Sequence, residues 1–159
     1  MSYVFSLKSY DKTPYLACVI TTIYIINGPN LNLLGKRDID IYGSMPFEEY
    51  FNSLKKEFPE LKLEYYQSNH EGFLIDKLQE VGFENNTGII LNAGGLSHTS
   101  IALRDAVTAV PAPVVEVHIS NIYQREPFRS HSFLTEVCVE HFIGHGLEGY
   151  RLGIHFLNR

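Results

Sequence analysis

The chain has 159 residues, 45% of them hydrophobic, and a formal net charge of −5 at pH 7. This length suits one domain with a full hydrophobic core and is too short for two domains of ordinary size. The acidic balance and the lack of a long basic run argue against nucleic acid or an anionic membrane surface as a partner, and no apolar run reaches the roughly 20 residues of a membrane-spanning helix.

The first residues of the chain form a separate segment. Residues 1–19 show no helical or strand period, and we expect an N-terminal extension, loose or packed on a neighbour, before a single domain at 20–159. Lysines precede the apolar run 15–26, as in a signal peptide, but no small-residue cleavage site follows. Cys18 and Cys138 lie far apart in apolar contexts and imply no disulfide framework, which fits a reducing cytoplasm.

Strands and helices alternate along the rest of the chain. Apolar or alternating runs predict five strands, at about 20–26, 61–66, 88–91, 114–119 and 136–143. After the first, second, third and fifth of these runs, apolar residues recur at helical spacing, and we expect a helix at each of these four places. Ser44 is expected to cap the first helix, and Ser68 and Glu71 have the spacing of a capping box at the second.

This alternation predicts an α/β fold in which five parallel strands form a doubly wound sheet with helices on both faces. We expect 61–66 to be an outer strand, because polar residues alternate with apolar ones. The all-apolar strand 88–91 is expected to be central. In such sheets a site lies outside the carboxyl ends of the strands.

The loop after the first strand carries Arg37 and Tyr42 between two glycines, Gly35 and Gly43. A phenol with a pKa of about 10 is a poor base near neutrality. A guanidinium within reach can lower that pKa by about 1–3 units, which would make Tyr42 a usable base. The alternative is that both residues are simply exposed in the loop.

His118 lies at the end of an otherwise valine and isoleucine strand. Glu116, two residues earlier, points to the same face and could fix the tautomer of the imidazole or raise its pKa. The alternative is a hydrogen-bonded core histidine with no role in chemistry.

Other chemistries find less support. The segment Asn92-Ala93-Gly94-Gly95 resembles a phosphate cradle, but it lacks the spacing of a nucleotide-binding loop, and a carboxylate or hydroxylated ring would fit as well. His141 and His145 lack the arrangement of metal ligands, so we expect no metal. The remaining candidates suit cofactor-free proton abstraction next to a carbonyl with loss of a leaving group.

Several long motifs resemble those of the type II 3-dehydroquinate dehydratases: N-G-P-N-L-N-L-L-G followed by R-D-x-x-x-Y-G, Q-S-N-H-E-G, N-A-G-G-L-S-H-T-S-I-A-L-R-D-A, and E-V-H-I-S-N with R-E-x-F-R. The match runs from about residue 23 to the C-terminus. The resemblance implies a flavodoxin-like fold, the elimination of water from 3-dehydroquinate without a cofactor, and a homododecamer built from trimers.

The resemblance also implies a role for each matching residue. Tyr42 would be the base that removes a C2 proton, with Arg37 stabilising its phenolate. His118 would protonate the departing C1 hydroxyl, oriented by Glu116, and Asn30 would hold a water against the developing enolate. The substrate-binding positions would be Asn92, His98, the Ile119 and Ser120 backbone and Arg129, with Arg125 in support and Asp105 supplied by a neighbouring subunit.

Two features depart from the family pattern. The N-terminal extension is longer than usual, and Glu140 and His141 stand in the fifth strand where small or apolar residues are expected. A biosynthetic and a quinate-degrading role both stay open. The alternative of another class is a flavodoxin-like module that binds a flavin or nucleotide without catalysis.

Overall fold

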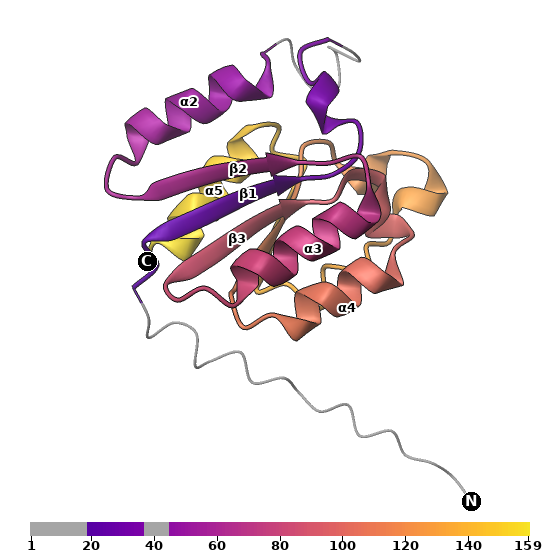
Figure 1. Ribbon diagram of the computed structural model, residues 1–159. Helices are drawn as coiled ribbons and strands as arrows, with labels where there is room; N and C mark the ends of the chain where they lie inside the picture. The colour runs from indigo at the N-terminus through magenta and orange to yellow at the C-terminus, as the bar shows by residue number, and fades with distance from the viewer. Residues whose placement is uncertain (1–18, 37–44) are drawn as a thin grey trace, which may run out of the picture.

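The computed structural model describes residues 19–36 and 45–159. Five parallel strands form one sheet in the order β2-β1-β3-β4-β5, with helices on both faces (Figure 1). This is the flavodoxin-like doubly wound order, so the predicted fold class is confirmed, with β2 at an edge and β3 in the centre. The strands are β1 (Thr22–Asn27), β2 (Lys62–Gln67), β3 (Thr87–Asn92), β4 (Val114–His118) and β5 (Glu140–Ile143), and the α-helices are α2 (Phe47–Glu57), α3 (Glu71–Gly82), α4 (Ile101–Ala109) and α5 (Glu148–Leu157).

The sheet separates two apolar cores. Helices α2 and α5 cover one face, where Tyr150 and Ile154 pack with Ile23 and Ile25 of β1. Helices α3 and α4 cover the other face, and their apolar residues pack with the alternate strand residues, Ile26, Ile89 and Leu91. All six residues of β3 are buried, because both of its faces are covered.

Helix starts differ from the expectation in two cases. Helix α3 begins at Glu71 with His70 at its N-cap, and neither end of the expected capping box is formed. The Ser68 hydroxyl instead accepts a hydrogen bond from the His70 amide at 3.0 Å, which closes the turn before the helix. Ser100 does cap α4, accepting from the Leu103 amide at 2.8 Å. The expected cap of the first helix was wrong: α2 begins at Phe47 with Pro46 at its N-cap and no side-chain cap, two residues after Ser44, which lies outside the described residues.

The last strand is shorter than the sequence indicated. Residues 136–139 were expected to begin β5, but the amides of Val137 and Cys138 both donate to the Leu134 carbonyl at 3.0 Å, which makes a turn there. Strand β5 is an outer strand, so the exposed side chain of His141 and the half-buried Glu140 are compatible with its position.

Two further features bear on the sequence analysis. Within residues 19–36 and 45–159, no helix combines the length and apolar character needed to cross a membrane. Cys138 is buried in the core beneath α3 and α4, whereas Cys18 and the extension before it lie outside the described residues.

Candidate active site

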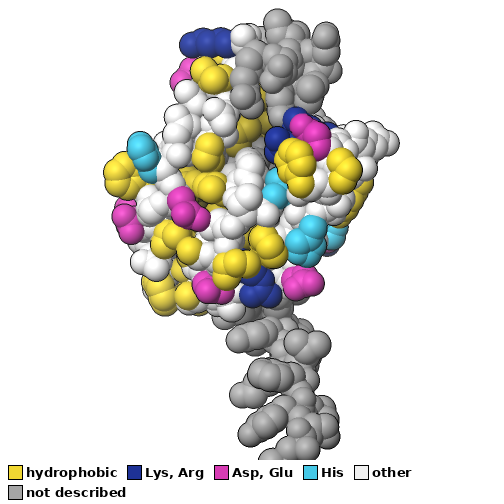
Figure 2. Space-filling model, turned by 90° about the vertical axis from the view of Figure 1, so that its right-hand side faces the viewer, with side chains coloured by type: hydrophobic (Ala, Val, Ile, Leu, Met, Phe, Trp, Pro, Cys, Tyr) yellow, Lys and Arg dark blue, Asp and Glu magenta, His cyan; other side chains and the backbone are white. Residues whose placement is uncertain are grey.

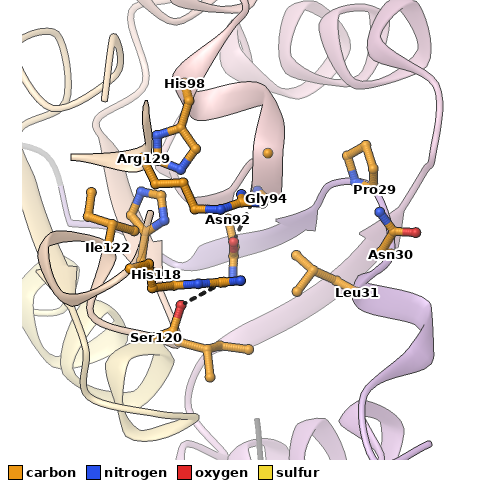
Figure 3. A pocket seen from close by; sticks show the side chains of 13 residues that line it. Pro29, Asn30, Leu31, Asn92, Gly94, His98, His118, Ser120, Ile122 and Arg129 are labelled. Carbon is orange, nitrogen blue, oxygen red and sulfur yellow. Dashed lines mark hydrogen bonds between the residues drawn. The ribbon is translucent and has the colours of Figure 1, made fainter. Parts of the chain in front are cut away.

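A pocket of about 260 Å³ opens at the carboxyl ends of the strands, where the sequence analysis placed a site. Figure 2 faces this edge of the sheet, and a hollow there has a histidine side chain in its wall. The lining comes from the ends of β1, β3 and β4 and from the segment after β4, and it consists of Pro29, Asn30, Leu31, Asn92, Gly94, Gly95, His98, His118, Ile119, Ser120, Ile122, Arg125 and Arg129 (Figure 3).

The β1 side of the pocket is a tightly held turn. Asn30 has a left-handed backbone, with φ of 68°, and its amide donates to Asn69 Oδ1 at 2.9 Å. Asn69 Oδ1 also accepts from Gln67 Nε2 at 3.1 Å. The end of β2 therefore supports this turn, although no β2 residue lines the pocket.

Gly28 sits where two backbones approach closely. Its amide donates to the Asn92 carbonyl at 2.7 Å. A Cβ at this position would lie 2.4 Å from the Ala93 carbonyl oxygen. The glycine of the N-G-P-N motif therefore allows the β1 and β3 ends to meet at the pocket, in addition to interrupting the strand.

His118 and Glu116 form the buried pair that the sequence predicted. His118 Nε2 lies 2.7 Å from Glu116 Oε1, and the Glu116 side chain is fully buried beneath the pocket. Two hydroxyls also donate to this carboxylate, Ser132 Oγ to Oε1 at 2.5 Å and Thr135 Oγ1 to Oε2 at 2.6 Å. Sequence reasoning missed Ser132 and Thr135, since only their polar character marked them and many residues share it.

The surroundings of Glu116 decide its charge. Burial alone would raise the pKa of the carboxyl, but the hydrogen bonds from His118, Ser132 and Thr135 outweigh it and hold the pKa below its usual range. Glu116 is therefore ionised at neutral pH, and it accepts the hydrogen on His118 Nε2.

His98 is held differently from its neighbour. Its Nδ1 lies 2.8 Å from the His131 carbonyl oxygen, and its ring stacks on that of His118 with centroids 5.9 Å apart. Burial lowers the pKa of His98, and the nearby His118 and Arg129 act in the same direction. His98 is therefore a neutral hydrogen-bonding group near pH 7.

Asn92 is fixed from behind the pocket by two residues that the sequence analysis did not single out. Asn92 Nδ2 donates to the Tyr150 hydroxyl at 2.8 Å, and that hydroxyl donates to Asn27 Oδ1 at 2.9 Å. Tyr150 was expected only as part of an apolar helix face. No pattern along the chain joins it to Asn27, which is 123 residues away.

Two arginines give the pocket a cationic side. Arg125 Nη1 donates to Ser120 Oγ at 3.4 Å, and Arg129 Nε pairs with Glu126 Oε2 at 2.8 Å. Their side chains are about one quarter exposed, at 25% and 27%. This side suits an anionic group such as a carboxylate.

The structure brings together eight of the predicted site residues at the pocket, namely Asn30, Asn92, His98, His118, Ile119, Ser120, Arg125 and Arg129, with Glu116 directly beneath. Asp105 is exposed on α4 and does not line this pocket. Arg37 and Tyr42 lie outside the described residues. The described part of the chain contains no group of three His, Cys, Asp or Glu side chains placed to hold a metal ion.

Similarity to known proteins agrees with this geometry. A curated 3-dehydroquinate dehydratase of Chlorobaculum tepidum is 49% identical over 138 residues, which are 86% of this chain and 93% of that protein. The Exiguobacterium sp. relative of the same name is 51% identical over 136 residues, covering 85% of this chain and 92% of its own.

Solved structures give the same result at the level of the fold. The crystal structure of a type II dehydroquinase from Butyrivibrio crossotus matches with a TM-score of 0.84 and 43% identity, covering 88% of this chain and 99% of that one. A type II dehydroquinase from Propionibacterium acnes matches with a TM-score of 0.82 and 33% identity, covering 89% and 99%. The family described as Dehydroquinase class II matches residues 21–158, and the chain belongs to this family.

Proposed function

We propose that the pocket at the carboxyl ends of the strands is the place where this class II dehydroquinase removes water from 3-dehydroquinate to give 3-dehydroshikimate. Family membership makes the chain a hydro-lyase of the 3-dehydroquinate dehydratase type. The family membership does not support the alternative, a flavodoxin-like module that binds a flavin or nucleotide without catalysis.

The observation that carries the proposal is the His118–Glu116 pair at the floor of the pocket. A carboxylate accepts and never donates, so the 2.7 Å contact requires a hydrogen on His118 Nε2. Glu116 is ionised and fully buried, and it therefore stabilises the imidazolium. Protonated His118 can then donate a proton through Nδ1 to a leaving hydroxyl, as a general acid.

Tyr42 is proposed to begin the reaction as its phenolate. The phenolate takes the proton from C2 of the substrate, and the electron pair moves onto the adjacent carbonyl to give an enolate. The enolate then re-forms the carbonyl while the C1 hydroxyl leaves with a proton from His118. One water and a conjugated enone result, and solvent resets the two proton carriers.

Two further groups are proposed to lower the barrier. Arg37 would keep Tyr42 ionised, because a guanidinium within reach favours the phenolate. Asn30, on the β1 side of the pocket, would hold a water against the enolate oxygen and stabilise its charge. Both Arg37 and Tyr42 lie in the glycine-bounded loop 35–43, which is proposed to close over the substrate.

Substrate binding is proposed for polar groups around the pocket. Arg129, with Arg125 in support, suits the carboxylate of the substrate, and the neutral His98 and the Asn92 amide suit its hydroxyls. The backbone of Ile119 and Ser120 is proposed to bind the substrate as well. Asp105 is exposed on α4 and does not line this pocket. Its proposed role is therefore in the pocket of a neighbouring copy, within trimers that assemble into a homododecamer.

The remaining expectations concern setting and organisation. We propose a cytoplasmic enzyme of the shikimate pathway, which needs no cofactor or metal. We also propose that residues 20–159 form one catalytic domain and that 1–19 are an extension to it. These proposals on location, pathway and domain organisation are based on the sequence, together with the family match over residues 21–158.

The test is a direct assay. Purified protein is mixed with 3-dehydroquinate, and formation of the conjugated product is followed by its near-ultraviolet absorbance, with and without a chelator. We expect the same rise in both. Tyr42→Phe and His118→Ala should each lose most turnover, since general acid or base catalysis contributes about 10²–10⁴-fold.

Ligand binding separates a catalytic from a structural effect. His118→Ala should still bind the product, as measured by calorimetry, because its fold and the other binding groups are intact. If the wild-type protein produces no absorbance change, the proposed reaction is wrong. If His118→Ala instead unfolds, His118 is a core histidine.

A further inference from the structure

A buried chain of hydrogen bonds runs from the pocket into the core between β1, β3 and α5. Asn92 Nδ2 donates to Tyr150 Oη at 2.8 Å, and Tyr150 Oη donates to Asn27 Oδ1 at 2.9 Å. Asn92 is 3% exposed, and the other two residues are fully buried. Of the three, only Asn92 lines the pocket.

The chain has a fixed direction. A phenol carries one hydrogen, and Asn27 Oδ1 takes it, so Tyr150 Oη can only accept from Asn92. Asn92 must therefore turn its NH₂ group toward Tyr150. At its other end, Asn92 Oδ1 accepts the Gly94 amide at 3.2 Å.

If the Asn92 side-chain amide were turned by 180°, so that Oδ1 and Nδ2 changed places, it would lose its hydrogen bonds with both Tyr150 and Gly94. It would place a carbonyl oxygen against a phenol oxygen whose hydrogen is already used, and an NH₂ group against the Gly94 N–H. Each buried polar group that is left without a hydrogen-bond partner makes that orientation less stable. The Asn92 amide is thus held in one orientation, with Oδ1 accepting from the Gly94 amide (Figure 3) and one Nδ2 hydrogen donated to Tyr150.

We infer that Tyr150, backed by Asn27, is a positioning residue for substrate, which holds the Asn92 amide so that it offers the pocket a hydrogen-bond donor. Asn92 then donates a hydrogen bond from Nδ2 to a substrate oxygen. This inference rests on the proposed function for its kinetic test. Tyr150 acts only through Asn92, because it is fully buried and does not line the pocket.

Tyr150 can keep this role at any working pH. Burial raises the pKa of its phenol above the ordinary value, and so its one hydrogen stays in place for Asn27. Asn27 and Asn92 are register partners on adjacent strands, so the sheet itself holds the two amides at the spacing that one phenol oxygen bridges.

The experiment compares two tyrosine to phenylalanine substitutions in the same core. Tyr150→Phe removes the bridging hydroxyl. Tyr50→Phe is the matched control: the rings of Tyr50 and Tyr150 lie 6.4 Å apart, and the buried Tyr50 hydroxyl has no hydrogen-bond partner in the described part of the chain. We expect Tyr150→Phe to raise KM for 3-dehydroquinate about tenfold, the equivalent of one hydrogen bond, and to change kcat less. Tyr50→Phe should change KM less than about twofold.

A double-mutant cycle tests whether Tyr150 works through Asn92. In an Asn92→Ala background, Tyr150→Phe should have almost no further effect on kcat/KM. Asn27→Leu removes the acceptor without touching the pocket, and it should raise KM like Tyr150→Phe does. An unchanged KM in a folded Tyr150→Phe protein, or full and independent losses in the double variant, would overturn the inference.

A second readout does not depend on turnover. In the wild-type protein, the Asn92 side-chain hydrogen that faces Tyr150 should be protected from exchange with solvent, as seen by NMR. Tyr150→Phe should remove that protection, whereas Tyr50→Phe should keep it. If the wild-type enzyme shows no dehydration, the proposed function fails. Unchanged protection in Tyr150→Phe refutes the positioning role in either case.

Discussion

His98 and His118 stack with ring centroids 5.9 Å apart, and each ring is anchored through a different nitrogen. The His131 carbonyl holds His98 at Nδ1, and the Glu116 carboxylate holds His118 at Nε2. Both partners can only accept, so the hydrogen of each contact lies on the imidazole nitrogen, which is Nδ1 in His98 and Nε2 in His118. A carboxylate anchors His118 and a backbone carbonyl anchors His98, so the two neighbouring histidines have chemically different partners.

The first prediction concerns the charge of His98. Because burial and its cationic neighbours lower its pKa, His98 should titrate below 6.5 in the folded protein. Protonation of His98 is then less favourable in the folded state than in the unfolded state. The free energy of unfolding should therefore decrease through His98 as the pH falls below 6.5. NMR of the ring hydrogens, with His98→Gln for assignment, measures the midpoint. A midpoint above 6.5 would contradict the neutral role.

The second prediction concerns Arg37 and the base. If the guanidinium lowers the phenol pKa of Tyr42 by about 1–3 units, Arg37→Ala should reduce kcat/KM near pH 7 by about 10–10³-fold. The loss should shrink as the pH rises toward the ordinary phenol value of about 10, where Tyr42 ionises without help. Lys36→Ala is the control for loss of a neighbouring positive charge. A loss of equal size at every pH would assign Arg37 to substrate binding instead.

The third prediction concerns stability in acid. The folded-state pKa of Glu116 is below its ordinary value of 4.5, so its contribution is fully present above pH 4.5 and is lost as the pH falls through the lower folded value. Glu116→Gln should lower the free energy of unfolding near pH 7 by about 1–3 kcal/mol. The difference from wild type should narrow below pH 4.5.

Urea unfolding between about pH 3 and 7 measures this difference. Glu49→Gln, an exposed carboxylate on α2, is the control and should leave the pH dependence nearly unchanged. If the difference in the free energy of unfolding between wild type and Glu116→Gln stays constant down to acid pH, the fold does not hold Glu116 ionised.

The fourth prediction concerns the backbone contact at the pocket. Gly28→Ala places a Cβ 2.4 Å from the Ala93 carbonyl oxygen, and the backbone of β1 or β3 has to shift. We expect Gly28→Ala to lower the free energy of unfolding by about 1–3 kcal/mol or more and to raise KM. Gly72→Ala is the matched control, because nothing lies within 4 Å of its Cβ position on an exposed part of α3. It should be neutral or stabilising by up to about 1 kcal/mol. Thermal unfolding distinguishes the two, and equal melting temperatures would argue against the close contact.

The order of elements could be predicted because it depends on local patterns. Periods of two and of 3.6 residues identify strands and helices, and their alternation leaves the doubly wound sheet as the expected solution. The errors fell at the ends of elements. Ser68 closes a turn where a capping box was expected, and β5 begins at Glu140 after an unexpected turn, because neighbouring backbone groups compete for the same hydrogen bonds.

By itself, the sequence determined the fold class, the edge of the sheet where the pocket lies, and the pairing of His118 with Glu116. These follow from spacing along one strand and from the meeting of parallel strand ends. Only the tertiary structure decided which nitrogen of each histidine is anchored, that Ser132 and Thr135 hold Glu116 ionised, and that Tyr150 joins Asn92 to Asn27. The reason is that hydrogen bonds between distant residues depend on how whole elements pack, and no local period of the chain records that packing.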